Sequence, residues 1–240
     1  MRAYLTRMTI RILSYNTHKC IGLDRRRRPD RIVSVLAHAK ADIVVLQEVD
    51  HRLGLRPAAL PSAMVEEATG LTLLPFALST VSLGWHGQTM LIRPNYTPLA
   101  LKRIALPGLE PRGAILAELE TPRGQLRVIG VHLALLSRYR RMQLAAIVAA
   151  MSHRAYMPTL IVGDFNEWSP RGGADALGPD FRLHAPGLSF PAARPLARLD
   201  RLALAHGLHL KGAGVVSGKV ARIASDHLPL WAEVSTQPLE

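Results

Sequence analysis

Eight residues whose side chains can bind a metal ion or move a proton lie at or beside the ends of apolar runs. They are Asn16, Glu48, His132, Asp164, Asn166, Asp200, Asp226 and His227. Taken singly, each has an ordinary reading, because Asn and Asp favour turns and a lone histidine often lies in a core with its hydrogen bonds satisfied. Together they are the carboxylates, amides and imidazoles of acid–base or metal-assisted chemistry, so the sequence favours an enzyme.

The runs before these residues have the patterns of strands. Residues 10–15 alternate apolar and polar side chains, whereas residues 42–50 and 159–168 contain the continuous apolar stretches of strands covered on both faces. Further strands are predicted at residues 77–83, 88–96, 101–107, 112–121, 124–135, 198–208 and 225–234. The polar residues are therefore expected at strand ends, where α/β proteins commonly build their sites.

Helical spacing occurs at residues 29–41, which open on a proline, and at residues 137–151, where Ser137 is a candidate cap. Helices and strands alternate in the first half and again near residue 140, with antiparallel-looking strands between. A mixed α/β architecture follows. We expect a single domain over residues 1–240, with residues 1–8 as a loose lead-in.

The chain is strongly basic, with a formal net charge of +12, a pI near 10.8 and 25 Arg against 5 Lys. The guanidinium fork matches phosphate oxygens, so an anionic partner is favoured, although a solvated Arg-rich surface explains the total charge equally well. Candidates for phosphate binding are Arg25, Arg26, Arg27 and Arg28, four adjacent like charges that repel one another unless an anion or a loop relieves them. Arg112, before a predicted strand, is another, though an ordinary exposed loop is as good a reading.

The compartment is indicated by what the sequence lacks. Positive charges interrupt every apolar run near the N-terminus, and no run approaches the ~20 apolar residues that cross a bilayer. The lone Cys20 cannot form an intrachain disulfide. We expect a cytoplasmic protein without a transmembrane segment, and the oligomeric state is left open.

Six segments in order, "LSYNTHK", "ADIVVLQEVD", "GVHLAL", "IVGDFNEW", "RLDRLAL" and "SDHLPLWAEV", resemble the endonuclease/exonuclease/phosphatase family. They span residues 13–234, and "GDFN" with a later "SDH" is the most specific pair. The exonuclease III type members have an acid where this chain has His18 and a tyrosine where it has His132. The resemblance is therefore closer to the deoxyribonuclease I and sphingomyelinase branches, and abasic-site repair is not expected.

The resemblance implies a four-layer α/β sandwich, in which two mostly antiparallel β-sheets pack face to face with helices outside and the site lies at one edge. It also implies cleavage of a phosphate ester that depends on Mg²⁺ or Mn²⁺. Hard cations prefer oxygen ligands, so Glu48, the amide oxygen of Asn16 and Asp226 form a suitable set.

The resemblance assigns the remaining roles position by position. Asp164 would orient or deprotonate the attacking water, and Asn166 would hold the scissile phosphate. His227 would donate to a phosphate oxygen or assist the water, with both options open, and Asp200 would hold its tautomer and its charge. His132 would act near the leaving oxygen or on the phosphate.

The predicted function is a phosphodiesterase acting on nucleic acid or on phospholipid head groups, with nucleic acid slightly ahead and peripheral contact with an anionic membrane as a further expectation. The alternative is a non-catalytic basic module that binds nucleic acid or anionic membrane. Acids inside a basic site repel phosphate unless a metal neutralises them, which favours the enzyme. Gly163 of "GDFN" would let the backbone approach the phosphate, and Arg138, Arg140 and Arg141 would add to a basic rim.

Overall fold

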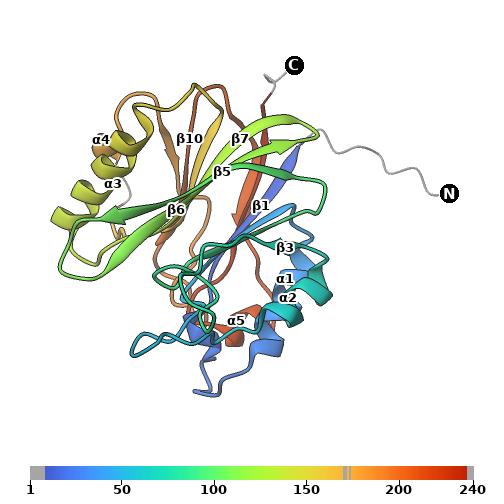
Figure 1. Cartoon of the computed structure of the whole chain (residues 1–240). Coiled ribbons are helices and arrows are strands. Elements are labelled where there is room, and N and C mark those ends of the chain that lie inside the picture. Colours follow the sequence, from blue (N-terminus) through green and yellow to red (C-terminus); the bar gives the residue numbers. More distant parts are fainter. Residues whose placement is uncertain (1–8, 170–171, 173, 237–240) are drawn as a thin grey trace.

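The computed structural model describes residues 9–169, 172 and 174–236, so the expected lead-in at residues 1–8 lies outside the described part. Two six-stranded sheets pack face to face with helices on their outer sides, which confirms the α/β sandwich (Figure 1). The first sheet has the order β11-β12-β1-β2-β4-β3 and the second β5-β6-β7-β8-β10-β9.

The strands of the first sheet are β1 (Ile10–Asn16), β2 (Ile43–Gln47), β3 (Thr72–Leu73), β4 (Thr89–Ile92), β11 (His209–Val215) and β12 (Leu230–Ser235). Those of the second sheet are β5 (Thr97–Leu106), β6 (Arg112–Thr121), β7 (Gly124–His132), β8 (Thr159–Asp164), β9 (Arg182–His184) and β10 (Asp200–Ala205). The helices are α1 (Pro29–Ala39), α2 (Ser62–Thr69), α3 (Ser137–Met151), α4 (Ala174–Leu177) and α5 (Ala221–Ala224), with a short 3-10 turn η1 (His18–Cys20).

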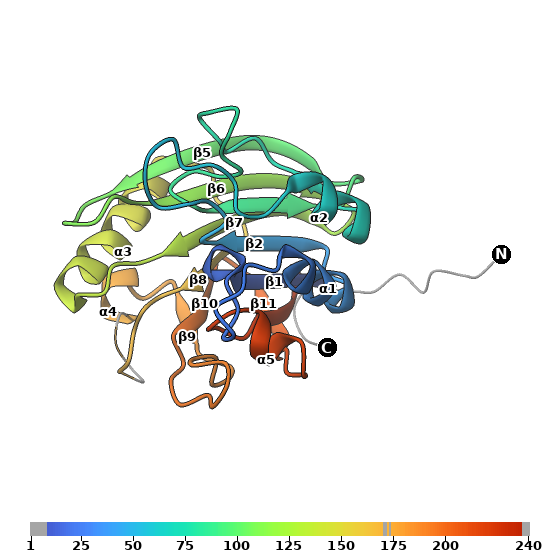
Figure 2. The ribbon, with the colours of Figure 1, turned by 90° about the horizontal axis from the view of Figure 1, so that it is seen from below.

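Each sheet is built around one parallel pair. Strand β1 pairs in parallel with β2 and β7 with β8, while the other neighbours are antiparallel. Parallel neighbours need a crossover connection, and α1 and α3 supply it. Helices α1 and α2 therefore cover one outer face of the sandwich, and α3 and α4 cover the other (Figure 2).

The continuous apolar runs arise because the central strands are covered on both faces. In β2, Ile43 and Val45 face the second sheet, whereas Val44 and Leu46 face the helical layer with α1. The sheets lie close together at Gly130 in β7, where an added Cβ would lie 2.6 Å from Cγ1 of Val45. Burial on both faces is the reason these strands lack polar alternation.

The strand register brings the polar residues to one side of the sandwich. His132 pairs with Asp164 and Asp164 pairs with Asp200 across the second sheet, while Asn16 pairs with Gln47 in the first. At this side β1, β2, β7 and β8 end and β4, β6, β10 and β12 begin; we call it the polar edge. It lies at the lower left of Figure 1.

Two details of the sequence interpretation are wrong. Residues 77–83 form no strand, because Ser79 Oγ accepts hydrogen bonds locally and contacts Ser82 Oγ at 2.8 Å, so side chains replace strand pairing. Ser137 is the first helical residue of α3, and Leu136 occupies the capping position without a side-chain cap. Within the part of the chain that the structure describes, no helix has both the length and the apolar character needed to cross a bilayer.

Candidate active site

The carboxylate of Asp164, at the end of β8, is the centre of the polar edge. Its Oδ2 receives a hydrogen bond from Asn16 Nδ2 at 3.1 Å and lies 3.5 Å from His132 Nε2 and 3.7 Å from His227 Nε2. Its Oδ1 accepts the backbone N–H of Asn166 at 2.9 Å. Strands from both sheets thus bring two imidazoles and two amides to one buried carboxylate.

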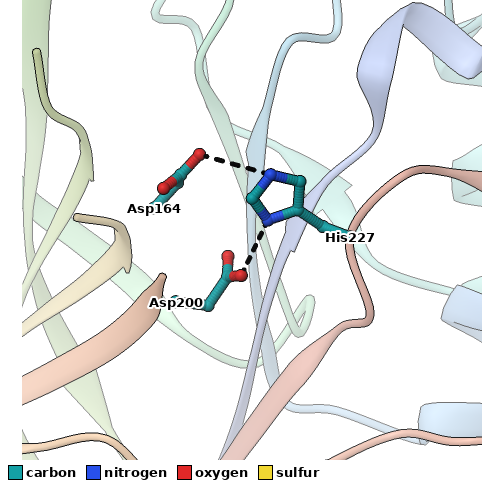
Figure 3. Close-up of side chains that lie close together, drawn as sticks. All are labelled: Asp164, Asp200 and His227. Carbon is teal, nitrogen blue, oxygen red and sulfur yellow. Dashed lines mark hydrogen bonds and ion pairs between the residues drawn. The ribbon is translucent and has the colours of Figure 1, made fainter. Parts of the chain in front are cut away.

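His227 is held between two carboxylates, as Figure 3 shows. Its Nδ1 lies 2.8 Å from Oδ2 of Asp200, a fully buried residue. Burial works to lower the pKa of His227, but the negative charges of Asp200 and Asp164 outweigh it and raise the pKa to about 10. Burial raises the pKa of Asp164, and the charge of His227 opposes that rise. His227 is therefore an imidazolium at neutral pH.

His132 is in the opposite state, although it faces the same oxygen. Burial, followed by the positive charge of Arg112, lowers its pKa to about 3. A neutral imidazole and a charged one thus meet at Asp164. The pair can supply a hydrogen-bonding group and a cation to a phosphate placed between them.

Glu48 follows β2 and lies in the left-handed region, with φ of 55°. Its Oε2 is paired with Nζ of Lys19, and its backbone oxygen accepts hydrogen bonds from Lys19 N at 2.9 Å and Thr17 Oγ1 at 3.0 Å. Burial works to raise the pKa of Glu48, but the neighbouring His132 imidazole and the hydrogen bond and charge of Lys19 outweigh it and lower the pKa to about 2. Backbone strain of this kind is common where a structure must aim a functional group.

The residues around Glu48 fit a divalent cation. The Lys19 ammonium is paired with the Glu48 carboxylate, and Asn16 ends the adjacent strand, with its Oδ1 accepting a hydrogen bond from His18 N at 3.1 Å. The predicted ligand Asp226 lies by the same loop, with Oδ1 3.9 Å from His18 Nδ1. The carboxylate oxygen of Glu48 and the amide oxygen of Asn16 are ligands that suit Mg²⁺ or Mn²⁺.

A second group, Asp164, Asp200 and His227, has ligand atoms within 4.8 Å of one another. This group carries its own cation, because His227 is protonated and its Nδ1 is bound to Asp200. A protonated imidazole cannot be a metal ligand. The hydrogen bond to Asp200 and the charge of His227 therefore make this group less suited to a metal than the oxygen atoms around Glu48.

Gly163 and Asn166 shape the turn that delivers Asp164. Gly163 has φ of 154°, and an added Cβ would lie 1.9 Å from the backbone oxygen of Val131 in β7. The close approach that the glycine allows is thus between strands, not toward a phosphate as the sequence suggested. Asn166 has φ of 50° and donates its Nδ2 to Leu133 O at 2.9 Å, which anchors the turn to β7.

A basic pocket opens beside Glu48 and His132. Its lining residues are Lys19, Glu48, Asp50, His51, Arg52, Arg56, His86, Gly87, Glu110, Pro111, Arg112 and His132. Arg112 is largely buried and bonds to Glu110 Oε2 at 2.7 Å. Arg56 NH1 contacts a histidine, His86 Nδ1 at 3.1 Å, rather than an acid. Arg112 thus lines the pocket beside Glu48, and its binding of a phosphate stays a prediction.

The Arg25 to Arg28 run divides into different environments. Arg27 NH1 lies 2.8 Å from Nε2 of His51, which lines the basic pocket, so this residue borders the site. Arg28 is bound through two nitrogens to Asp30, at 2.9 and 2.8 Å. Arg25 and Arg26 are exposed in the loop before α1. The loop and its own acids therefore relieve part of the repulsion.

Arg140 does not belong to a basic rim. It is buried, pairs with Glu167 Oε2 at 2.8 Å and donates to the backbone oxygen of Leu135. It therefore fixes the segment after Asp164 to the start of α3. The sequence interpretation also gave no role to Lys19 or to Ser225, whose Oγ donates to Asn16 O at 2.7 Å and ties the "SDH" segment to β1. Both lie inside the quoted motifs, which was the available signal.

A four-layer sandwich that gathers an acid, two imidazoles and amides at one edge has the deoxyribonuclease I-like class of fold and site. Residues 13–227 match the sequence profile of the Endonuclease/Exonuclease/phosphatase family. The chain belongs to this family, as its motifs predicted, and it is a phosphoric ester hydrolase. Members of the family generally depend on a divalent metal.

Solved structures are similar to the chain over nearly its whole length. A functionally unknown conserved protein from Enterococcus faecalis V583 is 19% identical with a TM-score of 0.76, covering 94% of this chain and 99% of that one. TDP2 of D. rerio, complexed with single strand DNA product, is 17% identical with a TM-score of 0.72, covering 95% and 99%. The human Nocturnin catalytic domain with bound sulfate anion is 20% identical with a TM-score of 0.66, covering 95% of each chain. At these identities the likeness shows the fold, and no curated protein matches the chain in sequence.

Proposed function

We propose that the chain is a phosphodiesterase that uses Mg²⁺ or Mn²⁺, with Glu48 and Asn16 as metal ligands and Asp226 beside them. The observation that carries the proposal is the Oδ2 atom of Asp164, which faces the Nε2 atoms of His132 and His227 at 3.5 and 3.7 Å. A phosphate and its attacking water need an acceptor and donors at one place, and this arrangement supplies both.

Asp164 is the group that orients the water and takes its proton. Its raised pKa makes the carboxylate a better base near neutral pH, and Asn166, bonded to it, is placed to hold the phosphate. His227 cannot be the base, because it already carries a proton. It instead donates to a non-bridging phosphate oxygen, and Asp200 keeps it charged and oriented.

In the proposed reaction, the bond that forms at phosphorus is matched by one that breaks, and each proton has an acceptor. The water oxygen bonds to phosphorus, its proton passes to Asp164, and the bond from phosphorus to the leaving oxygen breaks. His132 is neutral and offers a hydrogen bond near the leaving oxygen, which takes its proton from solvent. A metal bound at Glu48 would stabilise the negative charge that develops on the phosphate.

The substrate class is a phosphodiester in a nucleic acid or in a phospholipid head group. TDP2 of D. rerio was solved with a single strand DNA product and Nocturnin with a sulfate anion, so proteins of this fold bind oxyanions. Arg112 and Arg27 beside the pocket add cationic groups for such an ester. The buried lone Cys20 supports a reducing compartment, so we propose the cytoplasm.

The test is hydrolysis of bis(p-nitrophenyl) phosphate with chelator, Mg²⁺ or Mn²⁺. We expect no activity in chelator, recovery with either metal, and no recovery for Glu48→Gln. Asp164→Asn should lower kcat by at least ~10², the lower range for a positioned acid or base. Glu67→Gln, at an exposed position of α2, is the matched control and should behave as the wild type. Full activity in chelator, or a silent Asp164→Asn, would show that the mechanism is wrong.

A further inference from the structure

Large apolar side chains are exposed on one side of the molecule. In the described part of the chain, seventeen large hydrophobic residues are exposed, and all but Met64, Leu99, Met142 and Tyr156 lie in segments that leave or enter a strand at the polar edge. Scattered exposed leucines are normal in soluble proteins, but concentration on one face marks an interaction surface. The polar edge is therefore more than the mouth of the site.

Six of these residues stand on four loops around the site, and we call them the apolar rim. They are Leu53, Leu55, Leu109, Leu135, Leu136 and Trp168, with exposed fractions of 83%, 80%, 78%, 62%, 58% and 65%. In Figure 1 the turn between β5 and β6, in green, projects at the left, and the light-blue loop after β2 projects below it. Because these side chains project from loop tips, the rest of the chain does not bury their apolar surface.

Four of the six rim residues are tied to residues of the site. Leu53 and Leu55 lie between Arg52 and Arg56, which line the basic pocket, and Leu109 precedes a third lining residue, Glu110. Trp168 packs edge-on against Phe190 at 6.1 Å between ring centroids, and Phe190 packs on His227 at 4.9 Å. Anything that covers the rim therefore also covers the catalytic groups.

Positive charges are interleaved with the rim. Arg52 is 74% exposed, and its nearest acid, Glu110, is 3.7 Å away and already bound to Arg112. Arg138 follows Leu136 in the exposed first turn of α3. Aliphatic groups among arginines match a surface with an anionic face and an apolar layer beneath it.

We propose that the polar edge docks on an anionic phospholipid surface, with the apolar rim entering the acyl boundary and the neighbouring arginines contacting head groups. The inference rests on the proposed function, because docking brings a head-group phosphodiester to Asp164. Nucleic acid fits this rim less well: bases stack on aromatic rings, and Trp168 is the one exposed aromatic residue among its six members. Protein–nucleic acid interfaces are also more polar than a leucine rim.

The experiment is flotation with vesicles of phosphatidylcholine alone or mixed with phosphatidylglycerol, beside binding to a fluorescent single-stranded oligonucleotide. Wild-type protein should partition onto the mixed vesicles more strongly than onto phosphatidylcholine. The variant Leu53→Ser, Leu55→Ser, Leu109→Ser should lose at least ~10-fold in partitioning, since binding scales with the apolar area that enters the interface. The matched control is Leu99→Ser with Tyr156→Ser, two exposed apolar positions near the start of β5 and in the loop before β8, both remote from the polar edge.

The outcomes separate docking from catalysis. Both variants should hydrolyse bis(p-nitrophenyl) phosphate at the wild-type rate, because neither touches the catalytic groups. Unchanged vesicle binding by the rim variant would overturn the inference. Wild-type protein that binds the oligonucleotide but does not bind the vesicles would also overturn it. In either case normal hydrolysis of the soluble ester would leave the proposed function standing.

Discussion

Asp164 and its neighbours show that protonation states in the site follow from which charges are nearest. His132 and His227 are both buried and face the same carboxylate oxygen. His227 has Asp200 behind it, whereas His132 has the positive charge of Arg112 nearby, so the pKa of one rises and that of the other falls. The two histidines therefore have different tasks in spite of their shared contact.

Replacing Asp200 with Asn should expose this dependence. The raised pKa of His227 keeps it charged throughout the neutral range, and Asp200→Asn removes the larger of the two supporting charges. The pKa of His227 should then fall, so the kcat of the variant should decline at a lower pH on the alkaline side than that of the wild type. We expect the kcat of Asp200→Asn to fall less below that of the wild type at pH 6 than at pH 8.

His227→Ala is the reference for that measurement. It should lower kcat by at least ~10² at every pH, because the donor itself is gone. Profiles of kcat against pH for the three proteins decide the matter. An alkaline limb of Asp200→Asn that coincides with the wild type would contradict the role of Asp200.

At this scale the sequence predicted residue types better than contacts. The strand-end pattern and the motif order named the residues that meet at Asp164, because strand register carries them there. The prediction that Arg140 belongs to a basic rim was wrong, because a sequence alone does not show that this guanidinium lies buried against Glu167. The pairing of Lys19 with Glu48 was likewise invisible, because it depends on two loops with left-handed residues.

At the scale of elements, the pairing of β7 with β8 sets the position of Asp164. Gly163 lies opposite Val131, and the strands are so close there that only glycine fits. The preceding run, Leu160 to Val162, is buried on both faces, so the strand cannot shift to relieve a clash. Packing of the strand and chemistry of its last residue are therefore linked.

Gly163→Ala tests this link. The added Cβ would meet the Val131 oxygen at 1.9 Å, so the free energy of unfolding should fall by at least about 2 kcal/mol, as overpacked cores do. Gly70→Ala is the control: it also has a positive φ, but nothing lies within 4 Å of its added Cβ, and it should cost about 1 kcal/mol. Urea unfolding measures both, and equal losses would show that the close approach is unimportant.

Elements with strong periodicity were predicted well and short ones were not. The runs that became α1, α3, β2 and β8 carry their pattern over enough residues to be recognised. Helix α2 and the two-residue β3 are too short for a periodic signal, and their positions depend on contacts with α1 and β4. Residues 77–83 resemble a strand in composition, but their backbone bond to the neighbouring segment, from Ala58 N to Val81 O at 2.8 Å, does not extend into strand pairing.

At the scale of the whole molecule, the chain carries a large net positive charge, and several of its acids are paired with arginines. Glu118 in β6 is the clearest, because it binds Arg154 through both oxygens at 2.7 and 2.8 Å and Arg127 Nε at 2.8 Å. The hydrogen bond from Arg154, helped by Arg127, lowers the pKa of Glu118 to about 2 against the opposing effect of burial. This pair fastens the end of the second sheet that is remote from the polar edge.

Acid should therefore weaken the fold through Glu118. A carboxyl whose pKa is lowered in the folded state stabilises it above its ordinary value of 4.5, and this stability is lost as the pH falls toward 2. Glu118→Gln should cost about 2 kcal/mol at neutral pH, and the difference from the wild type should shrink below pH 4.5. Glu120→Gln, exposed two residues along β6, is the control and should change little. Urea titrations at several pH values measure these differences, and a gap that widens in acid would contradict the assignment.

The catalytic groups are divided between the two sheets. Asn16 comes from the first sheet and Asp164 from the second, and the 3.1 Å hydrogen bond between them crosses the seam. Catalytic turnover therefore depends on the packing of the two sheets against each other. If the sheets separate while each keeps its own strand pairing, activity should disappear although the circular dichroism of the strands persists. Under mild denaturant, loss of hydrolysis should precede loss of far-ultraviolet circular dichroism. The hydrolysis rate would then measure the contact between the sheets before the strands themselves unfold.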